Sequence, residues 1–254
     1  MEPVQSIERA LDILEAFTYS NPELGLVEIS KKVKLSKGTT YRIVYTLTSR
    51  GYISQDQNLG KYRLGPKSFE IGSVALSQME IRRVAHTYLE ELRNLTGEAT
   101  HLVVQDKGEA LYLDKLDSPR AIRMNSFIGQ RLPMHCTAVG KAMLADLPEL
   151  EVSYICNMRG MGRSTAKTIT TIEGLLQDLQ QVKAEGYAID DEENEEGLRC
   201  LAAPIRDYSG KVIAAISVSV PIFRFGDELR PNFVESLVST AKQISYQMGY
   251  HAMK

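Results

Sequence analysis

The sequence contains few cysteines and no long apolar run. Its three cysteines, Cys136, Cys156 and Cys200, are odd in number, lie far apart and form no C-x-x-C pair. This pattern indicates neither a disulfide framework nor a structural zinc site, and it favours reduced thiols. No apolar stretch approaches the roughly 20 residues that a membrane helix needs, and no cationic leader precedes an apolar segment. We therefore expect a cytoplasmic protein without membrane contact.

The chain is long enough for a substantial core. It has 254 residues, of which 43% are hydrophobic. These values are typical of one large or two moderate globular domains.

Positive charge is concentrated in one segment of a mildly acidic protein. Residues 26–65 contain eight Lys and Arg against two acidic residues, a local charge of +6 in a chain whose net charge is −2. The remaining residues therefore carry −8. A positive lobe on an otherwise negative protein predicts a polyanion partner at one end of the molecule.

The amino-terminal third shows helical periodicity. One stripe of apolar residues predicts a first helix of about four turns, and it consists of Ile7, Ala10, Leu11, Leu14 and Phe17. A second, short helix is predicted over residues 26–33, with its apolar residues on one face. Ser36 is a suitable N-cap for a third helix that runs to about Arg50.

On this third helix, apolar spacing places Thr40, Ile43, Val44 and Leu47 on the inner face. Lys37, Gly38, Thr39 and Arg42 then remain on the outer face near the helix start. Two helices joined by a tight turn, with polar residues in the first turns of the second, are typical of a helix-turn-helix that enters the major groove of DNA. Two short strands around residues 52–55 and 61–64 follow, and they predict a β-wing with Lys61 and Arg63 near phosphate.

The motifs QSIERALDILEAF, LVEISKKVKLSKGTTYRIVYTLTSRGYI and KYRLG resemble the winged helix-turn-helix of the IclR family of bacterial transcriptional regulators. The resemblance covers essentially the whole chain, with one departure at Thr40, where the family pattern is usually aliphatic. It implies binding of a palindromic operator in double-stranded DNA by a homodimer or tetramer, and repression of transcription. The expected DNA contacts are Ser36, Lys37, Gly38, Thr39, Thr40, Tyr41, Arg42, Lys61 and Arg63.

Beyond the wing, residues 66–78 predict a linking helix that starts at Pro66, and residues 79–97 predict a further helix that ends at Gly97. The pattern then changes to a period of two. Residues 99–118 predict one hairpin, residues 121–127 a further strand, and residues 198–221 a second hairpin. Helices are expected around residues 173–186 and 228–250. Strands joined in hairpins between helices predict an α+β fold on an antiparallel sheet.

The strand KVIAAISVSVP is notable for two hydroxyl groups on one face. Alternation places Ser217 and Ser219 beside Ala215, and Val212, Ala214, Ile216, Val218 and Val220 on the opposite face. Buried hydroxyl groups need partners, so these two either bond to neighbouring backbone or line a cavity for a hydrogen-bonding ligand. A second anion-binding element is predicted where Thr137 caps a helix of small residues at 138–145.

Taken alone, DDEENEEG after Ile189 is typical of a solvated acidic loop. The marks PMHCTAVGKAMLA and GLRCLAAPIRD, however, resemble the GAF-like effector domain of the same family. The resemblance implies effector contacts from Thr137, Ala138, Val139, Asp190, Cys200, Ser217 and Ser219. The chemistry of these groups favours a small keto or hydroxy monocarboxylate. Met124, Leu132 and Met134 are further candidates for the cavity wall.

Two alternatives remain. His135, Cys136 and Cys200 could form a metal- or thiol-responsive sensor, although adjacent side chains on an extended segment point to opposite faces. Cys200 could instead serve as a nucleophile with His86, His101, His135 or His251 as its base, but no spacing ties a histidine to Cys200.

The sequence thus predicts a regulator rather than an enzyme, with no catalytic residues, no metal and no cofactor. It predicts a winged helix-turn-helix DNA-binding domain at residues 1–65 and a linker helix at 66–80. A GAF-like effector-binding and oligomerisation domain is predicted at 81–254.

Overall fold

A computed structural model describes residues 3–56, 59–121, 125–226 and 230–251, without the side chain of Arg230. The chain divides into two compact units, residues 1–78 and 79–254. Among the described residues, no helix combines the length and the apolar character that crossing a bilayer requires.

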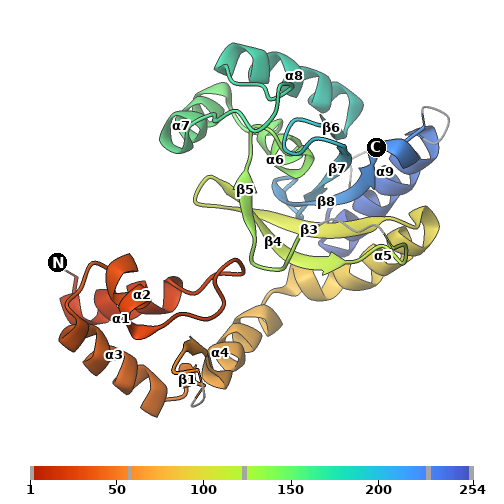
Figure 1. Ribbon diagram of the computed structural model, residues 1–254. Coiled ribbons are helices and arrows are strands. Elements are labelled where there is room, and N and C mark those ends of the chain that lie inside the picture. Colours follow the sequence, from red (N-terminus) through yellow and green to blue (C-terminus); the bar gives the residue numbers. More distant parts are fainter. Residues whose placement is uncertain (1–2, 57–58, 122–124, 227–229, 252–254) are drawn as a thin grey trace. The chain divides into compact units, whose positions relative to one another are not determined.

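The first unit carries the predicted helix-turn-helix and wing (Figure 1). Its elements follow the predicted order: α1 (Gln5–Glu15), α2 (Leu26–Lys32), α3 (Lys37–Ser49), β1 (Ile53–Gln55), β2 (Tyr62–Leu64) and α4 (Pro66–Ser77). The strands β1 and β2 pair antiparallel with Ser54 opposite Arg63. Asn58, at the tip of the predicted wing, lies outside the described residues.

The core of this unit brings together α1, α2, α3 and the hairpin through Ile13, Ile29, Val44 and Ile53, all of which are buried. The stripe predicted for α1 was partly wrong, since Ile7 and Leu11 are exposed. Burial centres on Ile13, and at about 100° per residue Leu11 lies about 200° away from Ile13 around the helix.

The turn between α2 and α3 has a specific local geometry. Lys34 adopts a left-handed backbone conformation with φ of 53°. The Ser30 hydroxyl donates to the Leu35 carbonyl at 2.7 Å. Ser36 then caps α3 as predicted, because its Oγ accepts from the Thr39 N–H at 3.2 Å.

The second unit is built around a six-stranded antiparallel sheet with the order β5-β4-β3-β8-β7-β6. Its strands are β3 (Ala99–Asp106), β4 (Glu109–Leu116), β5 (Arg131–Pro133), β6 (Ala188–Asp191), β7 (Leu198–Arg206) and β8 (Val212–Pro221). Its helices are α5 (Glu80–Thr96), α6 (Ala138–Leu144), α7 (Glu149–Arg159), α8 (Ile172–Glu185) and α9 (Arg230–Gln247), with a short 3-10 turn at Ile222–Arg224.

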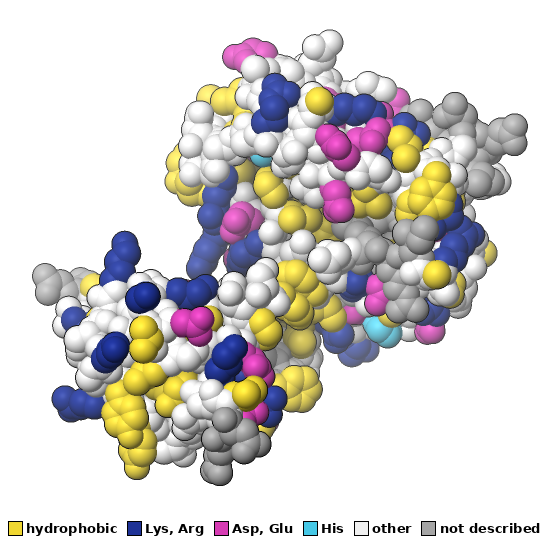
Figure 2. Space-filling model, in the orientation of Figure 1, with side chains coloured by type: hydrophobic (Ala, Val, Ile, Leu, Met, Phe, Trp, Pro, Cys, Tyr) yellow, Lys and Arg dark blue, Asp and Glu magenta, His cyan; other side chains and the backbone are white. Residues whose placement is uncertain are grey.

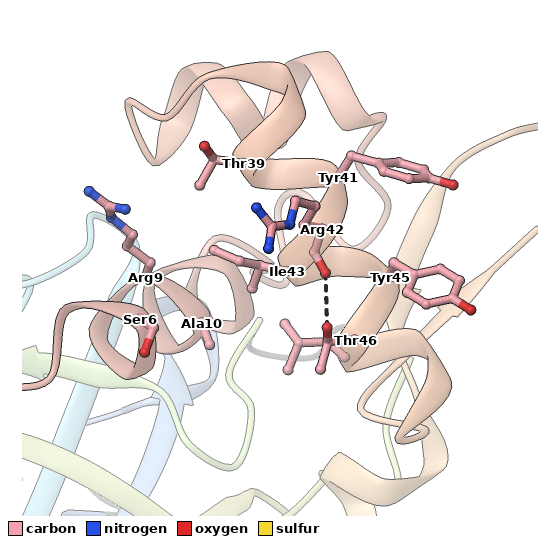
Figure 3. Close-up of a pocket in the computed structure, with 10 residues that line it drawn as sticks. Ser6, Arg9, Ala10, Thr39, Tyr41, Arg42, Ile43, Tyr45 and Thr46 are labelled. Atoms are coloured by element: carbon pink, nitrogen blue, oxygen red, sulfur yellow. Dashed lines mark hydrogen bonds between the residues drawn. The ribbon is translucent and has the colours of Figure 1, made fainter.

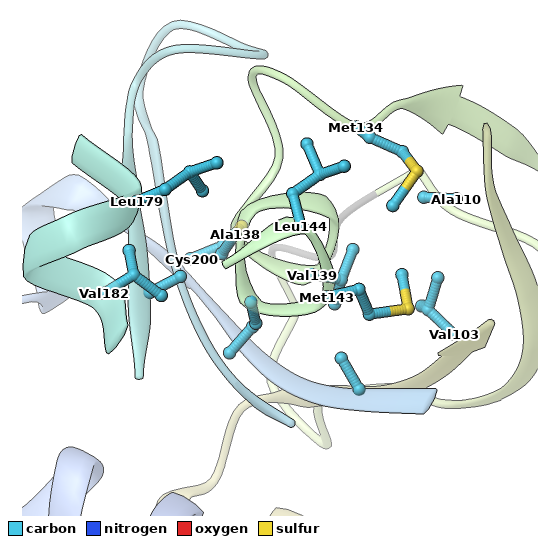
Figure 4. Packing of buried hydrophobic residues seen from close by; sticks show 14 of the residues in the cluster. Val103, Ala110, Met134, Ala138, Val139, Met143, Leu144, Leu179, Val182 and Cys200 are labelled. Carbon is cyan, nitrogen blue, oxygen red and sulfur yellow. The ribbon is translucent and has the colours of Figure 1, made fainter. Parts of the chain in front are cut away.

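Helices cover both faces of this sheet (Figure 1). On one face α5 and α9 bury an apolar layer that includes Leu89, Ile216 and Leu237. On the other face α6 and α8 pack over Val103 and Ala215, and Figure 4 shows the side chains of this second layer. The predicted α+β fold with an antiparallel sheet is confirmed.

The alternation predicted for β8 holds from Ala214 to Val220 and fails before it. Val212 packs with the layer under α6, whereas Ile213 packs with the layer under α9. The reason is a β-bulge, because the register shifts between Ile205 and Arg206 so that one extra residue of β8 is inserted there.

Other differences concern short or irregular elements. The sequence analysis missed β5, β6 and α7. It predicted a strand over residues 121–127, but residues 125–127 form no strand and residues 122–124 lie outside the described residues. The interpretation of DDEENEEG as a solvated loop was wrong in part, since Asp190 lies in β6 and is only 3% exposed, and Glu193 is also buried.

Candidate functional site

The start of α3 presents a polar and aromatic surface. Lys37, Gly38 and Arg42 are exposed, and the Tyr41 and Tyr45 side chains are 53% and 65% exposed. The two tyrosine rings lie 6.4 Å apart between centroids. Such a surface combines charge for phosphate with flat rings and hydrogen-bonding groups for base edges.

Two of the expected contact residues instead support the helix. Thr40 is fully buried, and its hydroxyl donates to the Ser36 carbonyl at 3.0 Å. A DNA contact from the Thr40 side chain is therefore ruled out by its burial, and the hydroxyl at this usually aliphatic position is satisfied within the helix. The Ser36 hydroxyl is engaged with Thr39, both through its N–H and through Oγ1 at 3.0 Å.

A groove between α1 and α3 extends this surface (Figure 3). It has a volume of about 510 Å³, and Ser6 and Arg9 of α1 line it together with Arg42 and Thr46 of α3. The Thr46 hydroxyl donates to the Arg42 carbonyl at 2.9 Å. Sequence reasoning missed Arg9, because only the packing of α1 on α3 brings it beside the recognition helix.

The wing adds two further cations. Lys61 and Arg63 are both exposed. Figure 2 shows Lys and Arg side chains gathered on the visible face of the first unit, with few acidic groups among them. The positive segment in the sequence thus forms a positive surface in this unit.

In the second unit, all seven residues expected to contact an effector line one cavity. Thr137, Ala138, Val139, Asp190, Cys200, Ser217 and Ser219 share it with Tyr112, Leu132 and Asn194. Its volume is about 10 Å³, room for about one water molecule. These residues come from separate segments of the chain, and the fold alone brings them together.

The sheet register explains how the strand residues meet. Asp190, Cys200 and Ser219 lie side by side on β6, β7 and β8, because Asp190 pairs with Cys200 and Cys200 with Ser219. The Cys200 thiol donates to Ser219 Oγ at 3.2 Å. Three polar groups therefore form a row across the face that α6 covers.

The start of α6 forms the wall of the cavity opposite the sheet. Thr137 caps the helix as predicted, since its Oγ1 accepts from the Gly140 N–H at 3.2 Å and donates to the Pro133 carbonyl at 2.7 Å. A Cβ on Gly140 would lie 2.2 Å from the Met134 carbonyl oxygen. Glycine at this position therefore allows α6 to approach the preceding chain closely.

Asp190 is the charged group of the cavity. Its Oδ1 accepts from the N–H groups of Glu193 at 2.7 Å and Asn194 at 3.3 Å. Burial is the main cause that raises the pKa of Asp190 to about 7, against the opposing effect of these two hydrogen bonds. Near neutral pH the group is therefore divided between its acid and its carboxylate.

A buried ion pair anchors the segment that follows Asp190. Lys141 Nζ lies 2.6 Å from Glu193 Oε1 and 3.0 Å from Asp178 Oδ2. Burial lowers the pKa of Lys141, but the charges of Glu193 and Asp178 outweigh burial and raise it, so the ammonium group stays charged. Sequence analysis did not find this network, because nothing in a lysine on a helix of small residues signals its burial.

The cysteines do not have the properties of nucleophiles. Burial raises the pKa of Cys200 above its ordinary value and raises that of Cys136 to about 12, the opposite of thiolate activation. In the described part of the chain, no hydrogen bond joins Cys200 to a histidine: His86 contacts Asp114, His101 contacts Ser126 and Ser217, His135 contacts the Gly162 carbonyl, and His251 packs on Tyr246.

The metal-sensor alternative lacks a ligand cluster. Among the described residues, no three or more His, Cys, Asp or Glu side chains are grouped so that they could hold a metal ion. His135 and Cys136 face different surroundings, since His135 donates to Gly162 and the Cys136 thiol faces Asn194.

The cavity wall also contains residues outside the expected set. Leu132 lies there as suggested, whereas Met134 is buried in the layer under α6 and Met124 lies outside the described residues. Tyr112 and Asn194 were missed. The alternation of β4 could have indicated Tyr112, but Asn194 follows no periodic pattern.

A winged helix-turn-helix joined to an antiparallel-sheet unit with a small polar cavity defines a ligand-responsive transcription regulator. Comparisons with known proteins agree. Residues 6–57 match the model of the IclR helix-turn-helix domain, and residues 73–246 match that of the bacterial transcriptional regulator IclR C-terminal region. The chain belongs to the IclR family of bacterial transcriptional regulators, and its second unit is the effector-binding domain of that family.

Individual relatives match over nearly their full length. The chain is 42% identical to the HTH-type transcriptional regulator KdgR of Escherichia coli, over 98% of this chain and 95% of KdgR. It is 35% identical to the transcriptional repressor IclR of Escherichia coli, over 97% and 90%. Among solved structures, an IclR homologue from Microbacterium hydrocarbonoxydans complexed with 4-hydroxybenzoate is 28% identical, with a TM-score of 0.84 over 96% of this chain and 98% of that one.

Proposed function

We propose that this protein is a cytoplasmic transcriptional repressor that releases or tightens its hold on a palindromic operator when a small keto or hydroxy monocarboxylate binds its second unit. The observation that carries this proposal is the meeting of Asp190, Cys200, Ser217, Ser219 and the start of α6 around one cavity. One relative, IclR of Escherichia coli, is itself named a repressor.

Operator binding is assigned to α3 and the wing. Lys37, Thr39, Tyr41 and Arg42 stand on the accessible start of α3, and Lys61 and Arg63 on the wing. The α3 residues supply groups that can reach bases or adjacent phosphates, and the wing cations supply phosphate contacts. A single such module seldom provides operator-level affinity, whereas two modules joined in a dimer or tetramer do.

The linking helix α4 supports pairing of subunits. Its side chains are not buried within the first unit, and Phe69, Ile71 and Val74 are exposed. An exposed apolar helix of this kind is typical of a surface that a second protein chain covers. We therefore assign α4 to the contact between subunits of a homodimer or tetramer.

The ligand class follows from the groups in the cavity. Two serine hydroxyls and the first backbone N–H groups of α6 supply donors for a carboxylate. Asp190 would repel a second negative charge, and it can accept from a ligand hydroxyl or hydrated carbonyl. A monocarboxylate with one hydroxyl group is the kind of molecule found with the Microbacterium homologue.

The test uses the double variant Asp190→Ala/Ser217→Ala. We expect it to lose binding of the effector by calorimetry, while operator affinity without effector stays within a few fold of the wild type. Asp207→Ala/Ser209→Ala is the matched control. It also replaces one aspartate and one serine, but in an exposed turn between β7 and β8. A full effector response in the cavity variant would place the ligand site elsewhere.

A further inference from the structure

His101 lies beside Ser217, on the neighbouring strand. The two residues pair across β3 and β8, and His101 Nδ1 is 3.2 Å from Ser217 Oγ. The other ring nitrogen, Nε2, is 2.9 Å from Ser126 Oγ. The imidazole is fully buried and packs edge-on against Tyr112, with 5.1 Å between ring centroids. Its nitrogens thus link Ser126 to a serine of the cavity.

This imidazole is neutral. Burial, followed by the charge of Lys115, lowers the pKa of His101 to about 3. A neutral imidazole has one N–H donor and one acceptor nitrogen, so the hydrogen bonds on its two sides must run in the same direction. Either Nδ1–H donates to Ser217 and Nε2 accepts from Ser126, or both bonds are reversed.

The two directions of these hydrogen bonds give the Ser217 hydroxyl opposite roles toward a ligand. When Nδ1–H donates to Ser217 Oγ, the serine hydrogen is free to donate into the cavity. When Nδ1 accepts from Ser217, the serine hydrogen is engaged in that bond, and Ser217 offers only lone pairs to a ligand. The first arrangement favours a carboxylate and the second disfavours it.

Surrounding charges select the first arrangement. Lys115 Nζ donates to the Ser126 carbonyl at 2.5 Å, so a positive charge lies on the Ser126 side of the ring. Asp117 offsets this charge only in part, because it pairs with Lys115 from a more exposed position. Asp190 lies on the cavity side with Ser217. A lone pair is stabilised toward a cation, so the charge of Lys115 places the lone pair on Nε2 and the proton on Nδ1. Asp190 adds to this preference in its ionised form, because an N–H is stabilised toward an anion.

We propose that His101 carries its proton on Nδ1 and thereby fixes Ser217 as a hydrogen-bond donor toward the cavity, which makes His101 a residue that determines specificity for a carboxylate over its neutral amide. The ligand class in this proposal rests on the proposed function above, whereas the position of the proton does not.

The second serine of the cavity has the same arrangement. The Cys200 thiol donates to Ser219 Oγ, and burial raises the pKa of this thiol, so it keeps its hydrogen. The Ser219 hydrogen is then free to donate in its turn. His101 and Cys200 therefore donate to Ser217 and Ser219 from the neighbouring strands, and together they leave two hydroxyl donors for one carboxylate.

The first test reads the tautomer in the full-length protein without any ligand. Two-bond 1H–15N correlation spectra distinguish Nδ1–H from Nε2–H in histidine, and the signals of His101 are those that disappear in His101→Phe. We expect the Nδ1–H form from pH 6 to 8. An Nε2–H form would overturn the proposal, whatever the protein binds.

The second test measures binding of 2-oxobutanoate and of the neutral 2-oxobutanamide by calorimetry. His101→Phe keeps an aromatic ring and removes both nitrogens, and we expect about tenfold weaker binding of the acid with little change for the amide. His101→Asn can still present an amide N–H toward Ser217, and it should restore the acid to within about threefold. Stronger binding of the acid by His101→Phe would show that His101 had been accepting from Ser217.

His135→Phe is the matched control, because His135 is a second buried histidine of the same unit that does not line this cavity. Operator affinity and the thermal midpoint report whether each variant folds. If the wild type binds neither probe but shows the Nδ1–H tautomer, the proposed ligand class fails while the assignment of His101 stands.

Discussion

Lys141 Nζ lies 2.6 Å from Glu193 Oε1, although the lysine side chain is only 1% exposed. The pair joins α6, whose start forms one wall of the cavity, to the segment after β6, which follows Asp190 and supplies Asn194 to the other wall. Thr165 and Thr168 reinforce the same segment, since their hydroxyls donate to the carbonyls of Glu192 and Glu193 at 2.6 Å.

Removing the lysine should destabilise the second unit strongly. Lys141→Met leaves Glu193 buried without a counter-charge, and breaking a buried pair in this way costs about 3–5 kcal/mol. Denaturant unfolding measures this loss. The double variant Lys141→Met/Glu193→Gln should recover part of it. Lys167→Met, which breaks exposed pairs with Asp191 and Glu192, should change stability little, and an equal loss there would contradict the special role of burial.

A methyl group at Gly140 should also disturb the cavity. Gly140→Ala places a Cβ against the Met134 carbonyl, where only backbone movement makes room, so we expect a loss of stability of about 1–3 kcal/mol together with weaker effector binding. Gly38→Ala on α3 is the control, because no atom lies within 4 Å of its added Cβ and the site is remote in sequence and fold unit from the cavity. Helix propensity predicts that this control is neutral or more stable by up to about 1 kcal/mol.

Binding of a carboxylate should weaken as the pH rises. The pKa of Asp190 is about 7, so the side chain is mostly neutral at pH 6 and mostly an anion at pH 8. An anionic ligand favours the neutral form and takes up a proton on binding, and the affinity should fall about tenfold over this range. Cys200 and Tyr112 remain protonated because burial raises both pKa values, and His101 remains neutral.

Calorimetry in buffers of different ionisation enthalpy measures the proton uptake. Asp190→Asn should abolish both the uptake and the pH dependence of affinity. An unchanged pH profile in this variant would assign the proton to another group.

Two cations of the first unit should affect DNA binding differently. Arg42→Ala should cost about 1–3 kcal/mol and relax the preference at one base pair if Arg42 binds a guanine edge. Lys61→Ala should weaken binding to all sequences alike and reduce the salt dependence by about one counterion. Lys211→Ala, an exposed lysine of the second unit, serves as the control. A salt slope for Lys61→Ala equal to that of the wild type would argue against the wing contact.

The sequence predicts those elements that have a clear hydrophobic period or a characteristic capping residue. Ser36 and Thr137 were identified as N-caps from the residue type and position, and both make the expected bond. The short strands β5 and β6 were not predicted, because three or four residues show no reliable alternation. In the sequence, Asp190 is the first residue of an acidic run. Its burial follows only from its pairing with Cys200 in the sheet.

For the candidate site, the sequence identifies the residue types but not the contacts behind them. Alternation places Ser217 and Ser219 on one face of β8, but it does not identify their partners. His101 lies 116 residues away from Ser217 in the chain. Contacts across such a distance depend on strand order, which the period of a single strand does not encode.

The small size of the cavity has a thermodynamic consequence. A molecule of several heavy atoms cannot enter a space of about 10 Å³, so we expect ligand binding to require a wider form that is less stable than this one without ligand. The measured affinity is then the affinity of that form multiplied by its fractional population. If widening moves the segment after Asp190, each interaction that holds this segment in place, including the Lys141–Glu193 pair, lowers the apparent affinity for the effector.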